Sequence, residues 1–552
     1  MSARVHIDNH AGDAPVGISL FEFAESLGVK VPTSCLKNGR CKECVVEVME
    51  GMELLSPPVE AERHLQGKYR LSCCARVAQS SGSVRCHTMR RGAMRIERHA
   101  FELPARGREW RLDPAVTRDG DRVLLDGAEI ACGPGPLHGL ALDLGTTTVV
   151  LRLLNLETGE VIADSSFENP QRFGGSDVMA RIHYDTNDGT RVLQRTLAGY
   201  LGHAIEELPV DPRSIYEVVV AGNSTMRDLF FRLSVYSIGQ SPYRSVTELE
   251  VAAGARTTTS LAEPARRLGL PVHPQARVYG LPIISGHVGA DAAACMLAVD
   301  LAHEDRLVAI MDIGTNTELI VGNRHKVLAA SCPAGPAFEG GQIAFGMPGL
   351  PGAIERVTIG DDGAVATGVI GDGPAQGICG SGLVDLLGEL RRTGRINRLG
   401  RFEDGSTTFV VDARGDPPIT VDEGDISALA QAKGANVAGL RIVLEEYGVR
   451  AADLEVFYLA GGFGRYLNVE ASERIGLIPN LDLTRVRQVG NAAIEGASIA
   501  LLSRAKRAEV EELVRRVTHC RLETHPHFFD IFVEGCQFAP LEDGPVMAPS
   551  PP

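Results

Sequence analysis

Periodic apolar positions near the N-terminus predict a small mixed domain. VHIDNH predicts the start of a strand, and SLFEFAESLGV predicts an amphipathic helix with Leu20, Phe23, Ala24 and Leu27 on one face. VVEVMEG, which follows a cysteine-rich loop, predicts the next strand. About the first 88 residues therefore have the order strand, helix, loop, strand.

Two later segments share an apolar strand, an Asp-x-Gly-Thr turn and a second strand. They are GLALDLGTTTVVLRLLNLETGEVI from Gly139 and, about 170 residues later, LVAIMDIGTNTELIVGNRHKVLAA. A P-loop or a dinucleotide fingerprint passes from a strand through glycines into a helix, and no G-x-x-x-x-G-K-S/T occurs here. A matching pair predicts two related subdomains. Ordinary hairpin turns are the alternative.

These turns have the composition of a phosphate site. Backbone amides and hydroxyls can bind phosphate oxygens, and carboxylates can hold Mg2+ through its waters. Asp143 and Asp312 are the candidate Mg2+ residues. Glu318 and Glu339 are alternative water-positioning acids, of which Glu318 is taken as the catalytic candidate, although either carboxylate fits a structural role equally well. The candidate phosphate-binding residues are Gly145, Thr146, Thr147, Thr148, Gly314, Thr315, Asn316 and Thr317.

Further glycine-rich and small-residue segments complete the pattern. LEVFYLAGGFGRYLNV ends a strand in Gly461, Gly462 and Gly464, where backbone can approach an adenine or ribose. YEVVVAGNSTMRDLFF is its counterpart in the first half. Residues 286–298 and 490–502 predict small-residue helices able to cross at close range.

Composition narrows the function classes. A chain of 552 residues is expected to form two to four domains, and 44% apolar with 23% charged residues is typical of a globular protein. No apolar run approaches the roughly 18 to 20 residues that cross a bilayer, and MSARVHIDNH lacks a signal core, so we expect a cytoplasmic protein. The net charge of −15 argues against nucleic acid as the main partner. An arginine-rich connector follows Met89.

Five of the twelve cysteines are clustered near the N-terminus, and the other seven are interpreted as structural. Cys35, Cys41 and Cys44 form a C-x5-C-x2-C run, and Cys73 or Cys74 follows after about thirty residues. Three thiolates from one loop and one from afar suit a 2Fe-2S cluster. A four-cysteine zinc site normally uses two C-x2-C pairs, and only one is present. Redox chemistry by the C-x2-C pair alone is a third, weaker alternative.

Residues 1 to about 88 resemble adrenodoxin-like and plant-like 2Fe-2S ferredoxins in the order of their elements. In those families the fourth ligand follows an Arg-Leu-x-Cys pattern, which corresponds here to Arg70, Leu71, Ser72 and Cys73. The resemblance therefore implies Cys73 as the fourth metal ligand beside Cys35, Cys41 and Cys44.

Residues 139–502 resemble the ASKHA superfamily of acetate and sugar kinases, Hsc70 and actin. The two phosphate turns, the two small-residue helices and the Gly461–Gly464 turn occur in that family's order. This resemblance implies binding of ATP and Mg2+ between closing halves, with Gly461 and Gly462 facing the nucleoside.

The combination resembles the reductive activators of corrinoid-dependent methyltransferases. Matching stretches are NPQRFGGSDVMARI, AGNSTM, LPIISGHVGAD, SCPAGPAFEGGQI, GICGSGLVDLL and AGGFGRYLN. The resemblance implies an ATP-hydrolysing iron-sulfur enzyme that reduces cob(II)alamin of a partner corrinoid protein to cob(I)alamin by one electron. It also implies an upstream low-potential electron donor and is compatible with a homodimer. The net charge and the lack of long apolar runs lead us to expect no nucleic-acid or membrane partner.

The expected fold is multidomain α/β, with an N-terminal β-grasp ferredoxin-like domain and duplicated ASKHA domains. The predicted boundaries are residues 1–88 for the ferredoxin domain, 89–138 for a linker, 139–304 and 305–502 for the two ASKHA subdomains, and 503–552 for a tail. Two isolated cysteines in the tail are too few for a 4Fe-4S cluster. The alternatives are an ASKHA small-metabolite kinase with a redox-regulatory ferredoxin domain, and a chaperone-like ATPase with a structural cluster. A radical-generating dehydratase activator would need a 4Fe-4S cluster bridging a dimer.

Overall fold

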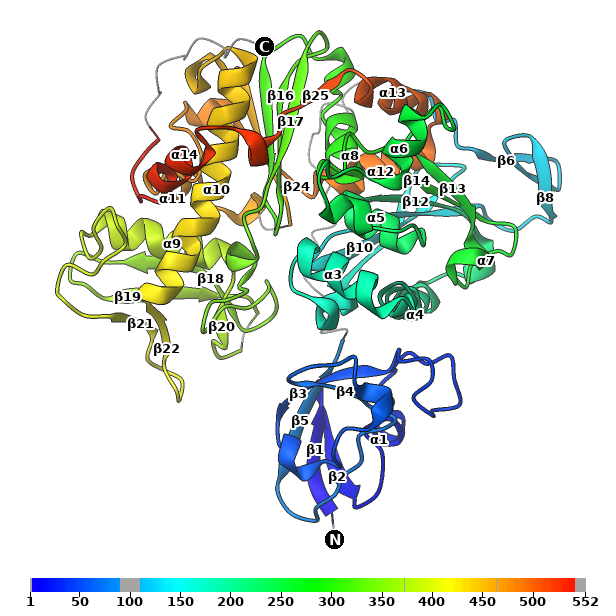
Figure 1. Ribbon diagram of the computed structural model, residues 1–552, viewed down its shortest axis with the longest axis horizontal. Helices are drawn as coiled ribbons and strands as arrows, with labels where there is room; N and C mark the ends of the chain where they lie inside the picture. The colour runs from blue at the N-terminus through cyan, green and yellow to red at the C-terminus, as the bar shows by residue number, and fades with distance from the viewer. Residues whose placement is uncertain (1, 90–109, 372, 463, 542–552) are drawn as a thin grey trace. The chain divides into compact units, whose positions relative to one another are not determined.

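The computed structural model describes residues 2–89, 110–371, 373–462 and 464–541 (Figure 1). Two compact units are present. Unit 1 comprises Met1–Ile96, Leu112–Leu281 and Ala500–Arg504, and unit 2 comprises Glu97–Arg111, Pro282–Ile499 and Ala505–Pro552. Most of the predicted arginine-rich connector lies outside the described residues.

The N-terminal sheet of unit 1 has five strands in the order β2-β1-β5-β3-β4. Strands β1 and β5, which come first and last along the chain in this domain, are neighbours in the sheet and pair in parallel. The other neighbouring strands are antiparallel. Helix α1 begins after Ser19, whose hydroxyl accepts from the Glu22 amide in a capping box, and it buries Leu20, Phe23 and Ala24 as predicted. The elements are β1 (Ser2–Ile7), β2 (His10–Pro15), α1 (Leu20–Ser26), β3 (Val45–Glu50), β4 (Tyr69–Leu71) and β5 (Ser83–Thr88).

A second sheet of unit 1 has the order β11-β10-β9-β12-β14-β13. Strands β9, β10 and β11 are antiparallel, whereas β12 and β14 continue from β9 in parallel. The strands are β9 (His138–Leu144), β10 (Thr148–Asn155), β11 (Val161–Glu168), β12 (Ile215–Gly222), β13 (Leu261–Pro264) and β14 (Arg277–Gly280), after a small sheet of β6 (Val116–Asp119), β7 (Arg122–Leu125) and β8 (Ala128–Cys132). The helices are α3 (Val178–Asp188), α4 (Val192–Glu206), α5 (Ser224–Phe230), α6 (Val246–Ala252) and α7 (Ala265–Leu268).

The main sheet of unit 2 repeats that arrangement as β24-β23-β15-β16-β17, with β25 added at the edge. Three antiparallel strands are again followed by two parallel ones. The strands are β15 (Val308–Asp312), β16 (Thr317–Gly322), β17 (Val327–Cys332), β23 (Val456–Ala460), β24 (Val486–Gly490) and β25 (Val517–His519). The repeated sheet topology and the five-stranded N-terminal sheet agree with the duplicated ASKHA fold and the β-grasp domain predicted from the sequence.

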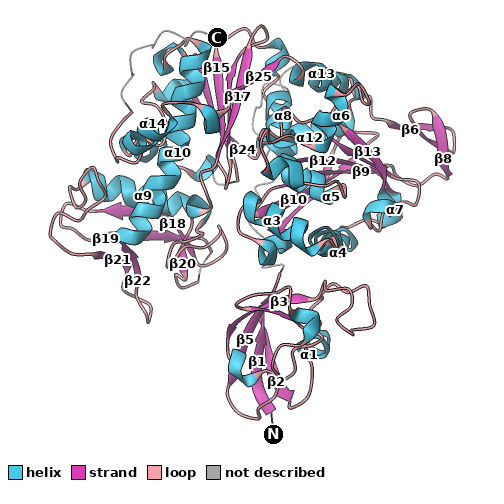
Figure 2. Cartoon of the chain, viewed as in Figure 1, coloured by secondary structure: helices cyan, strands magenta, loops and turns pink. Residues whose placement is uncertain are grey.

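The helices from residue 290 onward are α8 (Ala290–Ala298), α9 (Gly380–Arg392), α10 (Glu423–Tyr447), α11 (Val469–Arg474), α12 (Ala492–Leu502), α13 (Arg504–Val514) and α14 (Phe528–Gly535). The small strands are β18 (Ala353–Ile359), β19 (Val365–Val369), β20 (Gly377–Ile378), β21 (Thr408–Asp412) and β22 (Ile419–Asp422). Helix α10 packs on β16 and β17 of the main sheet, α8 contacts β15 and β16, and α9 packs on β18 of a smaller sheet (Figure 2). In the part of the chain that the structure describes, no helix combines the length and apolar character needed to cross a membrane.

The two predicted small-residue helices form α8 and α12. Helix α8 begins at Ala290, four residues later than expected, because the preceding residues form a turn in which the Ile284 and Ser285 amides donate to the Val288 carbonyl. A Cβ atom at Gly496 would lie 2.0 Å from the Ala294 carbonyl oxygen. The absence of a side chain at Gly496 is therefore what allows α12 to approach the backbone of α8.

Candidate functional site

The cysteine-rich loop lies between α1 and β3. Cys35 and Cys41 both lie near the Thr33 hydroxyl, whose oxygen is 3.9 Å and 3.7 Å from their respective sulfurs. Cys41 is buried and Cys35 is half-buried. The first two predicted ligands thus form one pair of thiols.

Cys44 and Cys73 form a second pair. The antiparallel pairing of β3 with β4 places Val45 opposite Leu71, and the Ser72 amide donates to the Cys44 carbonyl at 2.8 Å. A hydrogen bond between the two thiols lowers the pKa of Cys44 and raises the pKa of Cys73. A sheet contact therefore brings together cysteines that are far apart in the sequence.

Two pairs of sulfurs suit a flat two-iron cluster, which needs four cysteine thiolates over its two irons. A tetrahedral zinc with Zn–S bonds of about 2.3 Å would instead gather all four sulfurs within roughly 4 Å of one another. Among the described residues, one set of three or more potential metal-ligand side chains has ligand atoms that all lie within 4.8 Å of one another, and it consists of Asp300, His303 and Glu509. No cysteine of the described residues belongs to such a set. The Lys506 ammonium donates to Asp300 and Glu509 there, which marks that group as an ion-pair network.

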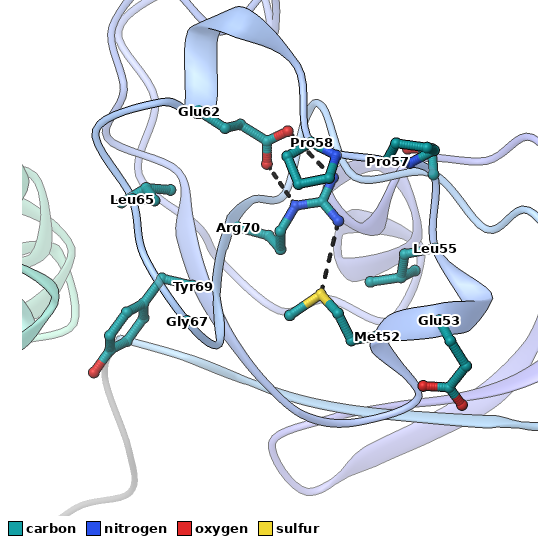
Figure 3. A pocket seen from close by; sticks show the side chains of 11 residues that line it. Met52, Glu53, Leu55, Pro57, Pro58, Glu62, Leu65, Gly67, Tyr69 and Arg70 are labelled. Atoms are coloured by element: carbon teal, nitrogen blue, oxygen red, sulfur yellow. Dashed lines mark hydrogen bonds and ion pairs between the residues drawn. The ribbon is translucent and has the colours of Figure 1, made fainter.

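A buried ion pair positions the segment that carries Cys73 (Figure 3). Arg70 donates from Nε to Glu62 Oε1 at 2.8 Å and from Nη2 to Glu62 Oε2 at 3.2 Å. Glu62 also accepts from the amides of Leu71 and Val59, both at 2.9 Å. The pair lines a cavity of about 400 Å³, together with Met52 and neighbouring apolar residues. The arginine of the Arg-Leu-x-Cys pattern thus connects the fourth predicted ligand to the 57–69 segment.

The cysteine loop contacts two helices of the same unit, α3 and α4. Arg195 of α4 donates from Nη2 to the Cys41 carbonyl at 2.7 Å, and its Nε lies 3.5 Å from Glu43. Lys42 forms an ion pair with Asp188 at the end of α3, at 3.5 Å. These polar contacts connect the Cys41–Glu43 part of the loop to α3 and α4.

The first Asp-x-Gly-Thr turn joins β9 to β10 as predicted. The Gly145 amide donates to the Thr148 carbonyl at 3.0 Å, and a Cβ atom at Gly145 would lie 2.6 Å from that oxygen. Asn223, the N-cap of α5, donates to the Thr146 hydroxyl at 2.9 Å, and Asn169 donates to the Gly145 carbonyl at 2.8 Å. Two asparagines therefore fix the conformation of this turn.

The second turn joins β15 to β16 in unit 2. The Gly335 amide donates to the Thr315 carbonyl at 2.8 Å, and the Thr315 hydroxyl donates to Glu339. Thr317 is fully buried, and its hydroxyl has no hydrogen-bond partner among the described residues. Thr315 and Glu339 are therefore coupled, whereas Thr317 lies inside the sheet.

Three carboxylates gather around the end of β15. Asp312 lies at the strand end, Asp291 lies in the first turn of α8, and Glu318 lies opposite Asp312 on β16. Burial raises the pKa of Glu318 well above its usual value, and the charges of Asp291 and Asp312 raise it further. Glu318 accepts a hydrogen bond from Ser331 at 3.2 Å and is 4% exposed. These oxygens are the ligand type that Mg2+ prefers, and they fit the predicted cation at Asp312.

The glycine turn after β23 lies against the same strand end. Gly461 has φ 109°, and a Cβ atom there would lie 2.3 Å from the Ile313 carbonyl and 3.2 Å from Asp312 Oδ1. No heavy atom lies within 4 Å of the Cβ position at Gly462, and Gly464 begins a short 3-10 turn. The backbone at Gly462 thus has the open, side-chain-free surface that close approach of a nucleoside requires, whereas Gly461 packs against the end of β15.

The sequence did not predict three residues that contact the two Asp-x-Gly-Thr turns or the carboxylates beside them. Asn169, Asp291 and Cys295 lie in or next to the stretches that resemble the activator family, but no local pattern marks them. Cys295 is interpreted as structural from the sequence, whereas its thiol donates to Asp312 at 3.2 Å. The signal that identifies these residues is their tertiary position beside the two Asp-x-Gly-Thr turns.

Comparison with known proteins agrees with this architecture. Residues 7–78 match the family model of the 2Fe-2S iron-sulfur cluster binding domain, residues 138–304 match the RACo middle region, and residues 306–546 match the C-terminal domain of RACo, the ASKHA domain. The class of protein is therefore a 2Fe-2S ferredoxin domain joined to an ASKHA-type ATPase.

Relatives define the family more closely. The chain is 33% identical over 432 residues to the corrinoid activation enzyme RamQ of Eubacterium limosum. The aligned region covers 73% of this chain and 70% of that protein. The chain is 24% identical over 424 residues to the [Co(II) methylated amine-specific corrinoid protein] reductase of Methanosarcina barkeri, covering 72% and 76%. A solved structure titled as a reductive activator for corrinoid, iron-sulfur protein matches with a TM-score of 0.71 at 28% identity, over 97% of this chain and 98% of that one. The chain belongs to the family of corrinoid activation enzymes.

Proposed function

We propose that this protein uses ATP to drive the one-electron reduction of cob(II)alamin to cob(I)alamin in a partner corrinoid protein, which restores methyltransferase activity. The observation that carries the proposal is the pairing of Cys35 with Cys41 and of Cys44 with Cys73 in a chain that also has the duplicated ASKHA fold. A ferredoxin domain supplies electrons, and an ATPase domain supplies free energy.

The four paired cysteines are the proposed metal ligands. When bound, a 2Fe-2S cluster supplies a one-electron carrier, with a potential of about −400 mV in plant-type ferredoxins. The Glu62–Arg70 pair anchors the strand that leads to Cys73, and Arg195 donates to the Cys41 carbonyl. The protein thus orients its thiolates through one buried ion pair and through backbone contacts.

ATP has a thermodynamic role in this proposal. Cob(II)alamin is reduced at a lower potential than a ferredoxin cluster readily supplies, so binding or hydrolysis of ATP must favour a state in which the cobalt accepts the electron. The turns after Asp143 and Asp312 each bind phosphate oxygens, the two aspartates organise Mg2+, and Gly461 and Gly462 face the nucleoside. Glu318 is the proposed water-positioning acid, and Glu339, coupled to Thr315, is its alternative.

Three further assignments belong to the same proposal. We infer an upstream low-potential electron donor, because each turnover consumes one electron. A cytoplasmic location is part of the same proposal. A homodimer is compatible with the proposal.

The test is an anaerobic reaction of the reconstituted holoprotein with a Ti(III) donor, a cob(II)alamin protein and ATP. We expect the cob(I)alamin absorbance to appear with ATP and not without it. A protein that binds no iron after reconstitution, or that reduces cobalt equally well without ATP, contradicts the proposal. A small-metabolite kinase would instead consume ATP with a metabolite in place of the corrinoid protein.

A further inference from the structure

The segment after β11 lies against the first Asp-x-Gly-Thr turn. The Asn169 amide donates to the Thr147 carbonyl at 2.6 Å, and the Asn169 side chain donates to the Gly145 carbonyl at 2.8 Å. Asn169 is 1% exposed and caps the short 3-10 helix Pro170–Gly174. A change in the conformation of this predicted phosphate turn would therefore displace that 3-10 helix.

The 3-10 helix is held by two longer helices of the same unit. Gln171, which is fully buried, donates from Nε2 to the Leu193 carbonyl of α4 at 3.2 Å. The Phe173 ring packs edge-on against Tyr184 of α3, with 5.7 Å between the ring centroids. These contacts leave little room for local rearrangement, so we expect the 3-10 helix to move as a rigid body.

Arg172 extends from this 3-10 helix to the sheet next to the cysteine loop. Its Nη2 donates to Glu47 of β3 at 2.6 Å, and its Nη1 forms an ion pair with Glu168 at the end of β11. The side chains of Arg172 and Glu47 are 13% and 2% exposed, so solvent ions screen their attraction only weakly. Glu47 lies in the strand that begins directly after Cys44. One guanidinium thus joins the strand beside a predicted ligand to the segment beside the phosphate turn.

Further contacts hold the N-terminal sheet against α4. Buried apolar residues of the sheet and of α4 belong to one hydrophobic core. A Cβ atom at Gly199 of α4 would lie 2.8 Å from the Pro32 Cβ, and the Met89 amide donates to the hydroxyl of the fully buried Tyr200 at 3.0 Å. The Arg172–Glu47 ion pair therefore belongs to a packed interface within unit 1.

We propose that Arg172 is a positioning residue that couples nucleotide binding at the first Asp-x-Gly-Thr turn to the reduction potential of the cluster. This inference rests on the proposed function and deepens it, because it identifies the contact through which bound nucleotide acts on the ferredoxin domain. Nucleotide and an added electron each bring negative charge to elements that share one guanidinium, so each opposes the other. Bound nucleotide should therefore lower the potential of the cluster and make it a stronger reductant.

Anaerobic redox titration of the reconstituted holoprotein tests the coupling, with and without Mg2+ and the non-hydrolysable analogue AMPPNP. Linkage requires the shift in potential to equal the difference in nucleotide affinity between the two oxidation states. We expect AMPPNP to bind about tenfold more weakly to the reduced protein, which corresponds to a decrease of about 59 mV in the midpoint potential. Calorimetry on the oxidised and reduced proteins measures the same coupling independently.

Variants at both ends of the ion pair test the role of Arg172. Arg172→Met and Glu47→Gln should reduce the tenfold effect to less than about twofold, whereas Arg172→Lys, which keeps the charge but not the forked geometry, should retain about threefold. Lys68→Met is the matched control, because Lys68 pairs with the same Glu47 carboxylate from within the ferredoxin domain, and it should retain the tenfold effect. Iron content and the visible spectrum should be unchanged in all four variants.

The outcomes separate this inference from the proposed function. An equal effect of AMPPNP in the wild type and in Arg172→Met would overturn the inference, and so would a wild type without a shift. Loss of the shift in Lys68→Met as well would also overturn it, because the shift would then follow the charge around Glu47. If Arg172→Met loads no iron, Glu47→Gln decides the question from the other end of the ion pair. A wild type that shows the shift but forms no cob(I)alamin would refute the proposed function alone.

Discussion

The thiol of Cys295 donates a hydrogen bond to Oδ2 of Asp312, with 3.2 Å between sulfur and oxygen. Burial raises the pKa of Cys295 well above its usual value, and the Asp312 charge raises it further, so the sulfur keeps its proton at neutral pH. The thiol can therefore act only as a donor to this carboxylate. A side chain from α8 thus helps to orient the aspartate at the end of β15.

Replacement of Cys295 should lower the apparent affinity of the ATPase reaction for Mg2+. Cys295→Ala removes a donor to a charged group, and we expect the Mg2+ concentration for half-maximal ATP hydrolysis to rise about three- to tenfold. Cys295→Ser keeps a donor and should stay close to wild type. An alanine variant with the same Mg2+ dependence as the serine variant would show that the hydrogen bond has no orienting role.

Exchange of the adjacent cysteines should separate ligand from neighbour. Cys73→Ser should abolish most of the iron content and the visible spectrum of the reconstituted protein, because Cys73 is the residue hydrogen-bonded to Cys44. Cys74→Ser should retain both, although its sulfur lies only 3.8 Å from that of Cys73. Iron analysis and absorbance check the outcome, and loss of iron in the Cys74 variant instead would reassign the fourth ligand.

The Glu62–Arg70 pair should be essential for the stability of the ferredoxin domain. Arg70→Met leaves a buried carboxylate without its cation, and we expect a loss of about 3 to 5 kcal/mol in the free energy of unfolding of that domain. Denaturant titration followed by the cluster absorbance measures it. The exposed Glu60–Arg63 pair is the control, and Arg63→Met should cost less than about 1 kcal/mol. Equal costs for the two variants would be inconsistent with this role.

Lys433 should give the protein a pH-dependent stability. It lies fully buried in α10, where it donates to the Gly535 carbonyl at the end of α14, and burial lowers its pKa to about 7. The unfolded chain then binds more protons than the folded one between that value and the ordinary lysine pKa of 10.5. The Lys433 contribution to stability therefore rises with pH across that window and is constant below it.

The matched variant is Lys433→Met, which cannot titrate. The difference in unfolding free energy between wild type and Lys433→Met should change in favour of the wild type as pH rises above about 7, by up to about 1.4 kcal/mol per pH unit. Comparison of the two proteins cancels the titration of other groups. Parallel stability curves across the window would show that Lys433 keeps its ordinary pKa in the fold.

The sequence predicted those parts of the protein whose signal is local. The Asp143 and Asp312 turns stand out because apolar strands on both sides of a Gly-Thr pair leave little alternative to a hairpin. The Gly496 crossing was foreseen from small-residue composition alone. Asn169 and Asp291 were not singled out, because an asparagine 24 residues after Gly145 acquires its contact only when β11 returns beside β10. The roles of the predicted ligand and nucleotide residues remain predictions.

One cysteine pair is local in the sequence and the other is formed by strand pairing, and this difference affects how the cluster can be inserted. Cys35 and Cys41 lie close together along one loop, whereas Cys44 contacts Cys73 only after β3 has paired with β4. A nascent or denatured chain thus has the three cysteines of the loop close together but lacks the fourth predicted ligand, Cys73. Iron loading should follow closure of that hairpin in time, which makes uptake of the metal a reporter of folding at the N-terminus.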